Sequence, residues 1–228
     1  MSMIDRIGTA LVLAPHPDDE VLGCGGVIAR LTASGKPVDV AIVTRGMPPA
    51  YPVEQVAQVV AEAKASHALL GVRHSHFLDL PAAALDQVPR AELNAAVRKV
   101  ILDVQPDTIF VPFVGDIHVD HQLVFSAAMV AARPAGGFRP CRILAYETVS
   151  ETNWDAPYLS PSFVPNIFIS IDGYLDKKIA AFERVASQVK DFPNERSVRA
   201  LTALAELRGA CVHVPAAEAF VLVREIDG

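Results

Sequence analysis

The stretch Ala10-Leu-Val-Leu-Ala14 is followed by Pro15-His-Pro-Asp-Asp-Glu20 and then by a run with helical spacing from Val21 to Ser34, which Gly35 ends. An apolar run of five residues has the length of a buried strand, and glycine is the common residue just past a helix. The stretch therefore predicts a strand followed by a helix, with a polar turn between them.

The same alternation of strand and helix continues along the chain. Further strands are predicted at 37–44, 76–80, 108–112, 142–147, 167–171 and 219–224, and further helices at 53–70, 90–104, 119–132, 175–190 and 198–208. A loop is predicted at 134–140. Strands that alternate with helices of this length form a parallel sheet, and strands that are apolar throughout are typical of a sheet covered on both faces. We therefore expect an α/β fold with a single Rossmann-like, doubly wound, mostly parallel sheet and helices on both faces, and one domain over residues 1–228.

Composition excludes several classes of protein. The 228 residues are 51% hydrophobic and 20% charged, and 20 Lys and Arg against 26 Asp and Glu give a net charge of −6. Disorder requires lower hydrophobicity, and nucleic-acid binding requires a basic cluster that this sequence lacks. The longest uncharged stretch, Ala156–Ile171, is shorter than the roughly 20 residues of a membrane span and contains three prolines. We expect no nucleic-acid partner and no membrane partner.

The first residues and the cysteines indicate the compartment. Met1–Ile4 leads directly to charged residues, so no signal-peptide pattern is present at this end of the sequence. Cys24, Cys141 and Cys211 are odd in number and far apart, which argues against a disulfide framework and against a thiolate zinc site. A cytoplasmic location is the expectation.

Polar residues follow two of the predicted strands directly. Pro15–Glu20 follows the first strand, and Gly115-Asp-Ile-His-Val-Asp-His121 follows the strand at 108–112. Open α/β sheets bind ligands beyond the carboxyl ends of their strands, and in the strand order 3-2-1-4-5 the first and fourth strands are neighbours. The two segments are therefore expected to meet in one cleft.

His16, Asp19 and His121 are the predicted metal ligands. Two imidazoles and one carboxylate are the protein ligands of a catalytic zinc that keeps one position open for water, and no cysteine of a closed structural site is nearby. The prediction is one Zn²⁺ per chain, with Fe²⁺ or another divalent ion as possible substitutes.

Asp18 and His118 are the predicted catalytic side chains beside that metal. Asp18 would accept a proton from the attacking water, and His118 would face the developing oxyanion as an imidazolium, with Asp120 as the carboxylate that orients it. These roles together predict a metal-assisted hydrolase of an amide or ester.

The same residues carry a family resemblance. Pro15-His-Pro-Asp-Asp-Glu-Val-Leu-Gly23 and His118-Val-Asp-His121 resemble the two signature motifs of the LmbE-like, or PIG-L, zinc-dependent N-deacetylases. The resemblance implies the same three zinc ligands, Asp18 as general base, and His118 supported by Asp120 as transition-state stabiliser. It also implies removal of an acetyl group from an N-acetylated amino sugar or related small amide, and a possible homo-oligomer.

The sequence departs from the family pattern at two positions. Val59 stands where family members commonly have an arginine that holds substrate hydroxyls, and Met47 stands where an acidic residue is common. Arg45, Asp79 and Arg196 are the predicted substrate contacts instead.

Two other classes of function share some of these features. A non-haem Fe(II) oxygenase uses the same set of two histidines and one carboxylate, although the βα alternation does not suggest a jelly roll. A non-catalytic nucleotide- or sugar-binding module would use the glycines of Gly23-Cys-Gly-Gly26, but these lack the GxGxxG spacing and follow three acidic residues. Close packing of helix against strand is the preferred explanation of these glycines.

Overall fold

The computed structural model describes residues 2–134, 138–154 and 156–227, so residues 135–137 of the loop predicted at 134–140 lie outside this range. The strands are β1 (Ala10–Ala14), β2 (Val38–Arg45), β3 (His74–Pro81), β4 (Thr108–Pro112), β5 (Arg142–Tyr146), β6 (Ile167–Ser170) and β7 (Ala217–Glu225). The helices are α1 (Met3–Arg6), α2 (Asp19–Ala33), α3 (Val53–Leu70), α4 (Arg90–Val104), α5 (Val119–Ala131), α6 (Leu175–Phe182) and α7 (Val198–Ala210), with 3₁₀ turns η1 (Leu85–Gln87) and η2 (Thr152–Trp154).

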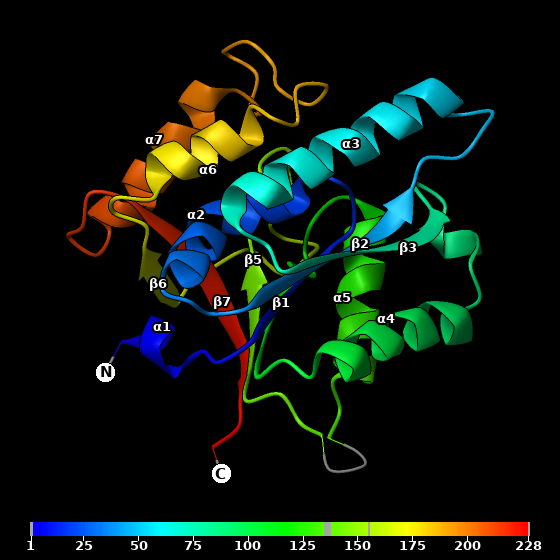
Figure 1. Ribbon diagram of the computed structural model, residues 1–228, viewed down its shortest axis with the longest axis horizontal. Helices are drawn as coiled ribbons and strands as arrows, with labels where there is room; N and C mark the ends of the chain where they lie inside the picture. Colours follow the sequence, from blue (N-terminus) through cyan, green and yellow to red (C-terminus); the bar gives the residue numbers. More distant parts are fainter. Residues whose placement is uncertain (1, 135–137, 155, 228) are drawn as a thin grey trace.

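The strands form one sheet in the order β3-β2-β1-β4-β5-β7-β6, which contains the predicted order 3-2-1-4-5 (Figure 1). The first five strands are parallel, whereas β7 runs antiparallel to both β5 and β6. On β1, Val12 pairs with Val40 of β2 on one side and with Phe110 of β4 on the other. The carboxyl ends of β1 and β4 therefore lie side by side, and the segments that follow them meet.

Helices cover both faces of the sheet. Figure 1 shows α2, α3, α6 and α7 on one face and α4 and α5 on the other. Alternate residues of a strand point to opposite faces, and on β1 Val12 packs in the core with α2 while Leu11 and Leu13 pack in the core with α4 and α5. The predicted doubly wound α/β fold is confirmed.

The glycines of α2 permit the close packing that the sequence suggests. A Cβ on Gly23 would lie 2.3 Å from the Tyr146 ring, and one on Gly26 would lie 2.7 Å from the Ile171 side chain. Any side chain at these positions would require the helix to move off the sheet.

A buried ion pair contacts the backbone in the middle of α2. The Glu218 carboxylate accepts the backbone N–H groups of Gly26 and Val27 at 2.8 and 2.7 Å. Nζ of Lys178 donates to the Leu22 carbonyl at 2.7 Å and to Oε1 of Glu218 at 2.7 Å. Side chains from α6 and β7 thus bond directly to backbone groups of α2 and fix this helix against both elements.

One predicted helix is shorter than expected. The pattern predicts a helix at 175–190, but α6 ends at Phe182. The N–H and Oγ of Ser187 both donate to Oε2 of Glu62 on α3, at 3.2 and 2.6 Å. Directly after α6 the backbone continues in tighter turns, in which the N–H groups of Arg184 and Val185 donate to the carbonyls three residues before them, and the contact with Glu62 holds the following residues against α3.

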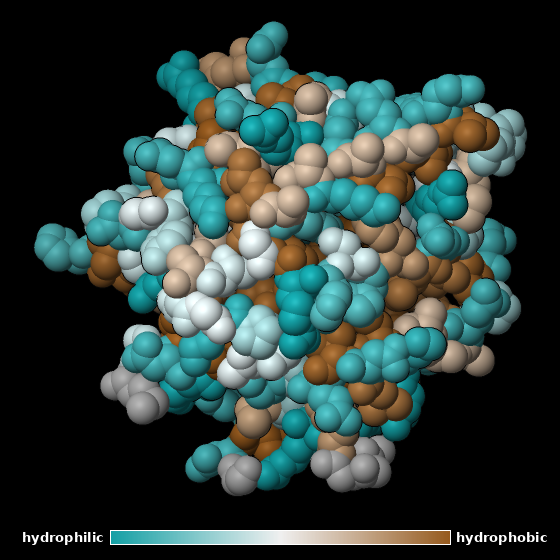
Figure 2. Space-filling view, in the orientation of Figure 1, coloured by the Kyte–Doolittle hydropathy of each residue, from teal (hydrophilic) through white to brown (hydrophobic). Residues whose placement is uncertain are grey.

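On the face seen in Figure 2, hydrophilic residues are interspersed with hydrophobic ones, and a brown hydrophobic group lies to the right of the centre, below α3. Within residues 2–134, 138–154 and 156–227, no helix combines the length and the apolar composition needed to cross a bilayer.

Candidate metal and active site

The turns after β1 and β4 place the predicted site residues together. His16 lies in the turn that leaves β1, and Asp18 and Asp19 occupy the N-cap and first position of α2. His118 is the N-cap residue of α5, and His121 lies in the first turn of that helix. Two helix N-termini therefore direct these side chains towards one point at the carboxyl edge of the sheet, as the sequence predicts.

His16, Asp19 and His121 form a compact cluster. Nδ1 of His16 lies 3.3 Å from Oδ2 of Asp19, and Nε2 of His121 lies 3.2 Å from the same oxygen. One ligand atom from each residue lies within 4.8 Å of the others. Asp19 and His121 are fully buried, and His16 is half-buried towards the pocket.

The hydrogen bonds of this cluster fit a cation. Nδ1 of His121 donates to Oδ2 of Asp116 at 2.8 Å, and Nε2 of His16 donates to Oδ2 of Asp120 at 3.1 Å, because a carboxylate can only accept. The other nitrogen of each ring then presents a lone pair towards Asp19. Nε2 of His121 and Oδ1 of Asp19 are buried without a hydrogen-bond partner, which is costly unless a ligand supplies one. These residues fit a divalent metal ion.

Asp116 is a site residue that sequence reasoning did not assign. Its carboxylate accepts from His121 and also, at 2.7 Å, from Oγ1 of Thr152. Carboxylates commonly hold the outer nitrogen of a metal-binding histidine. The sequence contains a signal for this role, because Asp116 lies in the segment that follows β4 and stands five residues before His121.

The pairing of Asp120 differs from the expectation. The sequence predicts that its carboxylate orients His118, but this carboxylate contacts His16 and also accepts the N–H of Ala83 at 2.7 Å. His118 instead accepts the backbone N–H of Asp120 on Nδ1, at 3.1 Å, because it caps α5. Nε2 of His118 is therefore left as a donor.

The hydrogen bond on Nδ1 of His118 is that of a neutral ring, whereas the sequence predicts an imidazolium. Burial, together with the neighbouring His16 charge, lowers the pKa of His118 below its ordinary value. A neutral ring with Nδ1 as acceptor and Nε2 as donor matches its hydrogen bonding.

Carboxylates surround the two ligand histidines. Burial opposes a charge on His16, yet Asp120 and Asp19 raise its pKa to about 9. Burial likewise opposes a charge on His121, yet Asp19 and Asp116 raise its pKa to about 10. The cluster therefore attracts positive charge strongly, and protons and a metal ion compete for the same nitrogens.

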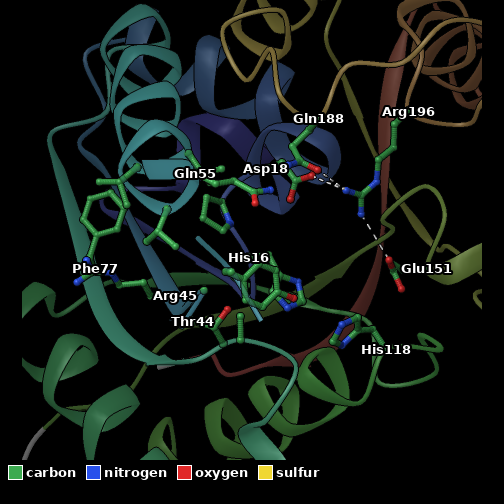
Figure 3. A pocket seen from close by; sticks show the side chains of 17 residues that line it. His16, Asp18, Thr44, Arg45, Gln55, Phe77, His118, Glu151, Gln188 and Arg196 are labelled. Atoms are coloured by element: carbon green, nitrogen blue, oxygen red, sulfur yellow. Dashed lines mark hydrogen bonds and ion pairs between the residues drawn. The ribbon is translucent and has the colours of Figure 1, made fainter. Parts of the chain in front are cut away.

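Asp18 is buried beside the cluster. Burial and the adjacent Asp19 charge raise the pKa of Asp18 to about 7, although Arg196 opposes this shift. Nη1 of Arg196 donates to Oδ2 of Asp18 at 2.8 Å and to Oε1 of Gln188 at 3.1 Å (Figure 3). Arg196 thus lies at the site, in contact with the predicted base.

The side chains open into a pocket of about 230 Å³. His16, Asp18 and His118 line it together with Arg45 and Arg196, and Figure 3 shows Phe77 and Arg45 at the end away from His118. Asp79 is not in the lining described for this pocket; its Oδ1 lies 3.7 Å from Nη1 of Arg45, and both side chains are about half exposed. The roles of Arg45, Asp79 and Arg196 as substrate contacts stay predictions.

A family model described as PIG-L, GlcNAc-PI de-N-acetylase, matches residues 11–132, more than half of the chain and both turns that carry the cluster. The chain belongs to the PIG-L family. The resemblance that the two motifs indicate is thereby confirmed.

Several known proteins are similar to most of the chain. An uncharacterised deacetylase of Escherichia coli K12, YaiS, is 29% identical over 76% of this chain and 88% of its own length. The 2'-N-acetylparomamine deacetylase of Streptomyces fradiae is 27% identical over 82% of this chain and 75% of its own. The crystal structure of a conserved protein from Thermus thermophilus superposes with a TM-score of 0.76 at 27% identity, covering 96% of both chains.

Proposed function

We propose that this PIG-L chain is a zinc-dependent N-deacetylase that hydrolyses the acetamide of an N-acetylated amino sugar or related small amide. The buried, unpartnered Nε2 of His121 and Oδ1 of Asp19 carry the proposal, because they lie beside His16, which lines the pocket together with Asp18. The relatives named as deacetylases favour this function over the Fe(II) oxygenase and the non-catalytic module. A cytoplasmic location and a homo-oligomer stay predictions.

His16, Asp19 and His121 would hold the metal, which when bound supplies a Lewis acid that acidifies water and polarises the acetyl carbonyl. Asp18 accepts the proton of the attacking water, and a pKa near neutrality suits a group that must both take and return a proton. Nε2 of His118 donates to the oxygen that gains negative charge. The C–N bond breaks, the nitrogen receives the proton from Asp18, and acetate and a free amine leave.

The test combines elemental analysis with acetate release from a panel of N-acetyl sugars and amides. We expect about one zinc per chain, lost in His121→Ala together with activity. His74→Ala is the matched control, because His74 is exposed and lies on β3 outside the cluster. A protein that binds no metal after reconstitution, or a His121→Ala variant as active as the parent, would contradict the proposal.

A further inference from the structure

We infer that the substrate carries an apolar group that packs against α3, beyond the acetamide that reacts. This inference rests on the proposed function and names the substrate class of the same pocket. An N-acetyl sugar with an apolar aglycone and one with a longer acyl chain both have this chemistry.

One face of α3 supplies an apolar wall. Val56, Val59 and Val60 all line the pocket and follow the spacing of residues on one side of a helix. Val56 is buried, whereas Val59 and Val60 keep part of their surface exposed towards the cavity. A ligand that covers these methyl groups would remove apolar surface from water, which favours an apolar ligand group.

Two rings extend this wall. Tyr51 packs against Gly46, where a Cβ would lie 2.8 Å from the Tyr51 ring, and both residues line the pocket. Phe77 of β3 lies at the end away from His118 (Figure 3). The valines and the two aromatic rings form a concave surface that reaches from beside His16 and Asp18 to the far end of the cavity.

Several polar groups of the pocket are already engaged. Oγ1 of Thr44 donates to the Pro15 carbonyl at 2.8 Å, and Arg196 is bonded to Asp18 and Gln188. Arg45 and Gln55 also line the pocket, and both are exposed. Sugar hydroxyl groups laid on the valine methyl groups would lose water without a partner among those valines, which is unfavourable. The polar part of the substrate therefore faces Arg45, Gln55 and the solvent side, and an apolar part faces the valines of α3.

The experiment compares substrates that differ only in an apolar group, using the full zinc-loaded chain. N-acetylglucosamine is compared with its phenyl β-glycoside and with N-hexanoylglucosamine. We expect kcat/KM to be at least about tenfold higher for one of the two apolar derivatives, since hydrophobic contacts of this size discriminate by roughly 10- to 200-fold. The favoured derivative tells whether the aglycone or the acyl chain lies on α3.

Two variants test whether the preference for an apolar derivative arises at the valines of α3. Val59→Thr places a hydroxyl on the wall with little change in volume, and we expect it to lower the preference ratio at least about threefold because an apolar contact is replaced by a polar one. Val53→Thr is the matched control, because Val53 lies on the same helix, is 62% exposed and is not in the lining described for the pocket. It should leave the ratio unchanged.

Failure of the inference about the apolar group and failure of the proposed deacetylase function give different results. Hydrolysis of N-acetylglucosamine as fast as of both derivatives, or a ratio that Val59→Thr does not change, would overturn the inference and leave the deacetylase function intact. Hydrolysis of no substrate would contradict the function, and titration calorimetry of Asp18→Asn with the same three compounds then decides the inference. Tighter binding of a derivative with a negative heat-capacity change supports the inference, and equal binding overturns it.

Discussion

Asp18 and Asp19 are neighbours in sequence, yet their surroundings give them opposite properties. Burial works against ionisation of Asp19, but His121 and His16 hold its pKa well below its usual range. Asp18 faces Arg196, and its pKa rises to about 7 because of burial and the Asp19 charge. Pairs of carboxylates whose surroundings separate their pKa values in this way divide the work of a ligand and a base.

Substitution of Asp18 separates these two roles. We expect Asp18→Asn to lower kcat by about 10²- to 10⁴-fold, the usual contribution of a general base, while the zinc content stays at the parental level. Acetate release and elemental analysis on the same preparation measure both. Asp103→Asn on the exposed side of α4 is the control. Full activity of Asp18→Asn would remove the base assignment.

Asp116 offers a prediction about the metal that is independent of turnover. Asp116→Ala removes the carboxylate that holds Nδ1 of His121, and we expect zinc affinity to fall roughly 10- to 100-fold. Competition against a chromophoric chelator measures the affinity, with Asp172→Ala at an exposed turn as the control. Unchanged affinity would mean that His121 is held by its packing alone.

The metal ligands could be predicted from the sequence because they follow β1 and β4 directly, and a parallel sheet brings those strand ends together. The hydrogen-bond partners of these ligands could not be predicted from the sequence. Whether the Asp120 carboxylate turns to His118 or to His16 depends on the first turn of α5, where His118 serves as the cap. Arg196 reaches Asp18 from a loop 178 residues away, a contact that no local pattern encodes.

At the scale of elements, periodicity predicted α3, α4 and β4 with the bounds that the structure has. These segments have strong apolar patterns and clear end signals. The pattern failed after Phe182, where the apolar spacing continues but the backbone changes to turns with bonds to carbonyls three residues back, and the Ser187 N–H donates to Glu62 of α3. The direction of β7 was equally beyond local reasoning.

The buried ion pair between Lys178 and Glu218, which packs against α2, predicts a large loss of stability when it is broken. Glu218→Gln leaves the Lys178 ammonium buried without its counter-charge, and breaking a buried pair costs about 3–5 kcal/mol. Urea unfolding followed by circular dichroism measures the free energy of unfolding. Glu206→Gln on the exposed side of α7 is the matched control. A loss below about 1 kcal/mol, within the range of an exposed pair, would show that water reaches Lys178.

The contact between β2 and β3 predicts a pH dependence of stability. Burial opposes ionisation of Asp39, but hydrogen bonds from Arg73 at 2.7 Å and His76 at 3.1 Å lower its pKa. A carboxylate with a lowered folded-state pKa stabilises the fold fully above its unfolded value of about 3.9, and this stabilisation disappears as the pH falls through the folded-state pKa.

Asp39→Asn should therefore lower the free energy of unfolding by about 1–2 kcal/mol at pH 7, with the difference from the parent shrinking below about pH 4. Urea titrations between pH 3 and pH 7 follow the difference, with Asp103→Asn as the exposed control. A difference that stays constant down to pH 3 would contradict the assignment.

For the whole molecule, metal binding should appear as stability. A ligand that binds only the folded state at 1,000 times its Kd adds about 4 kcal/mol, and at about 2–4 °C per kcal/mol for a chain of this size the melting temperature rises by roughly 8–16 °C. Scanning calorimetry of the chelated and zinc-loaded protein tests this, with His121→Ala expected to show no rise. An equal rise in both proteins would place the zinc elsewhere. That residues 1–228 form one domain stays a prediction.

The hydrogen bonds between Glu218 and α2 limit where the chain can be truncated. The region that the family model matches ends at residue 132 and contains all three ligand residues, but the amides of Gly26 and Val27 are satisfied by the last strand of the chain. A fragment that stops before β7 would carry the complete motif on a helix that has lost the Glu218 carboxylate, and it would leave the Lys178 ammonium without its counter-charge. In a chain emerging from the ribosome, these contacts to the helix that carries Asp19 can form only after Glu218 has been made.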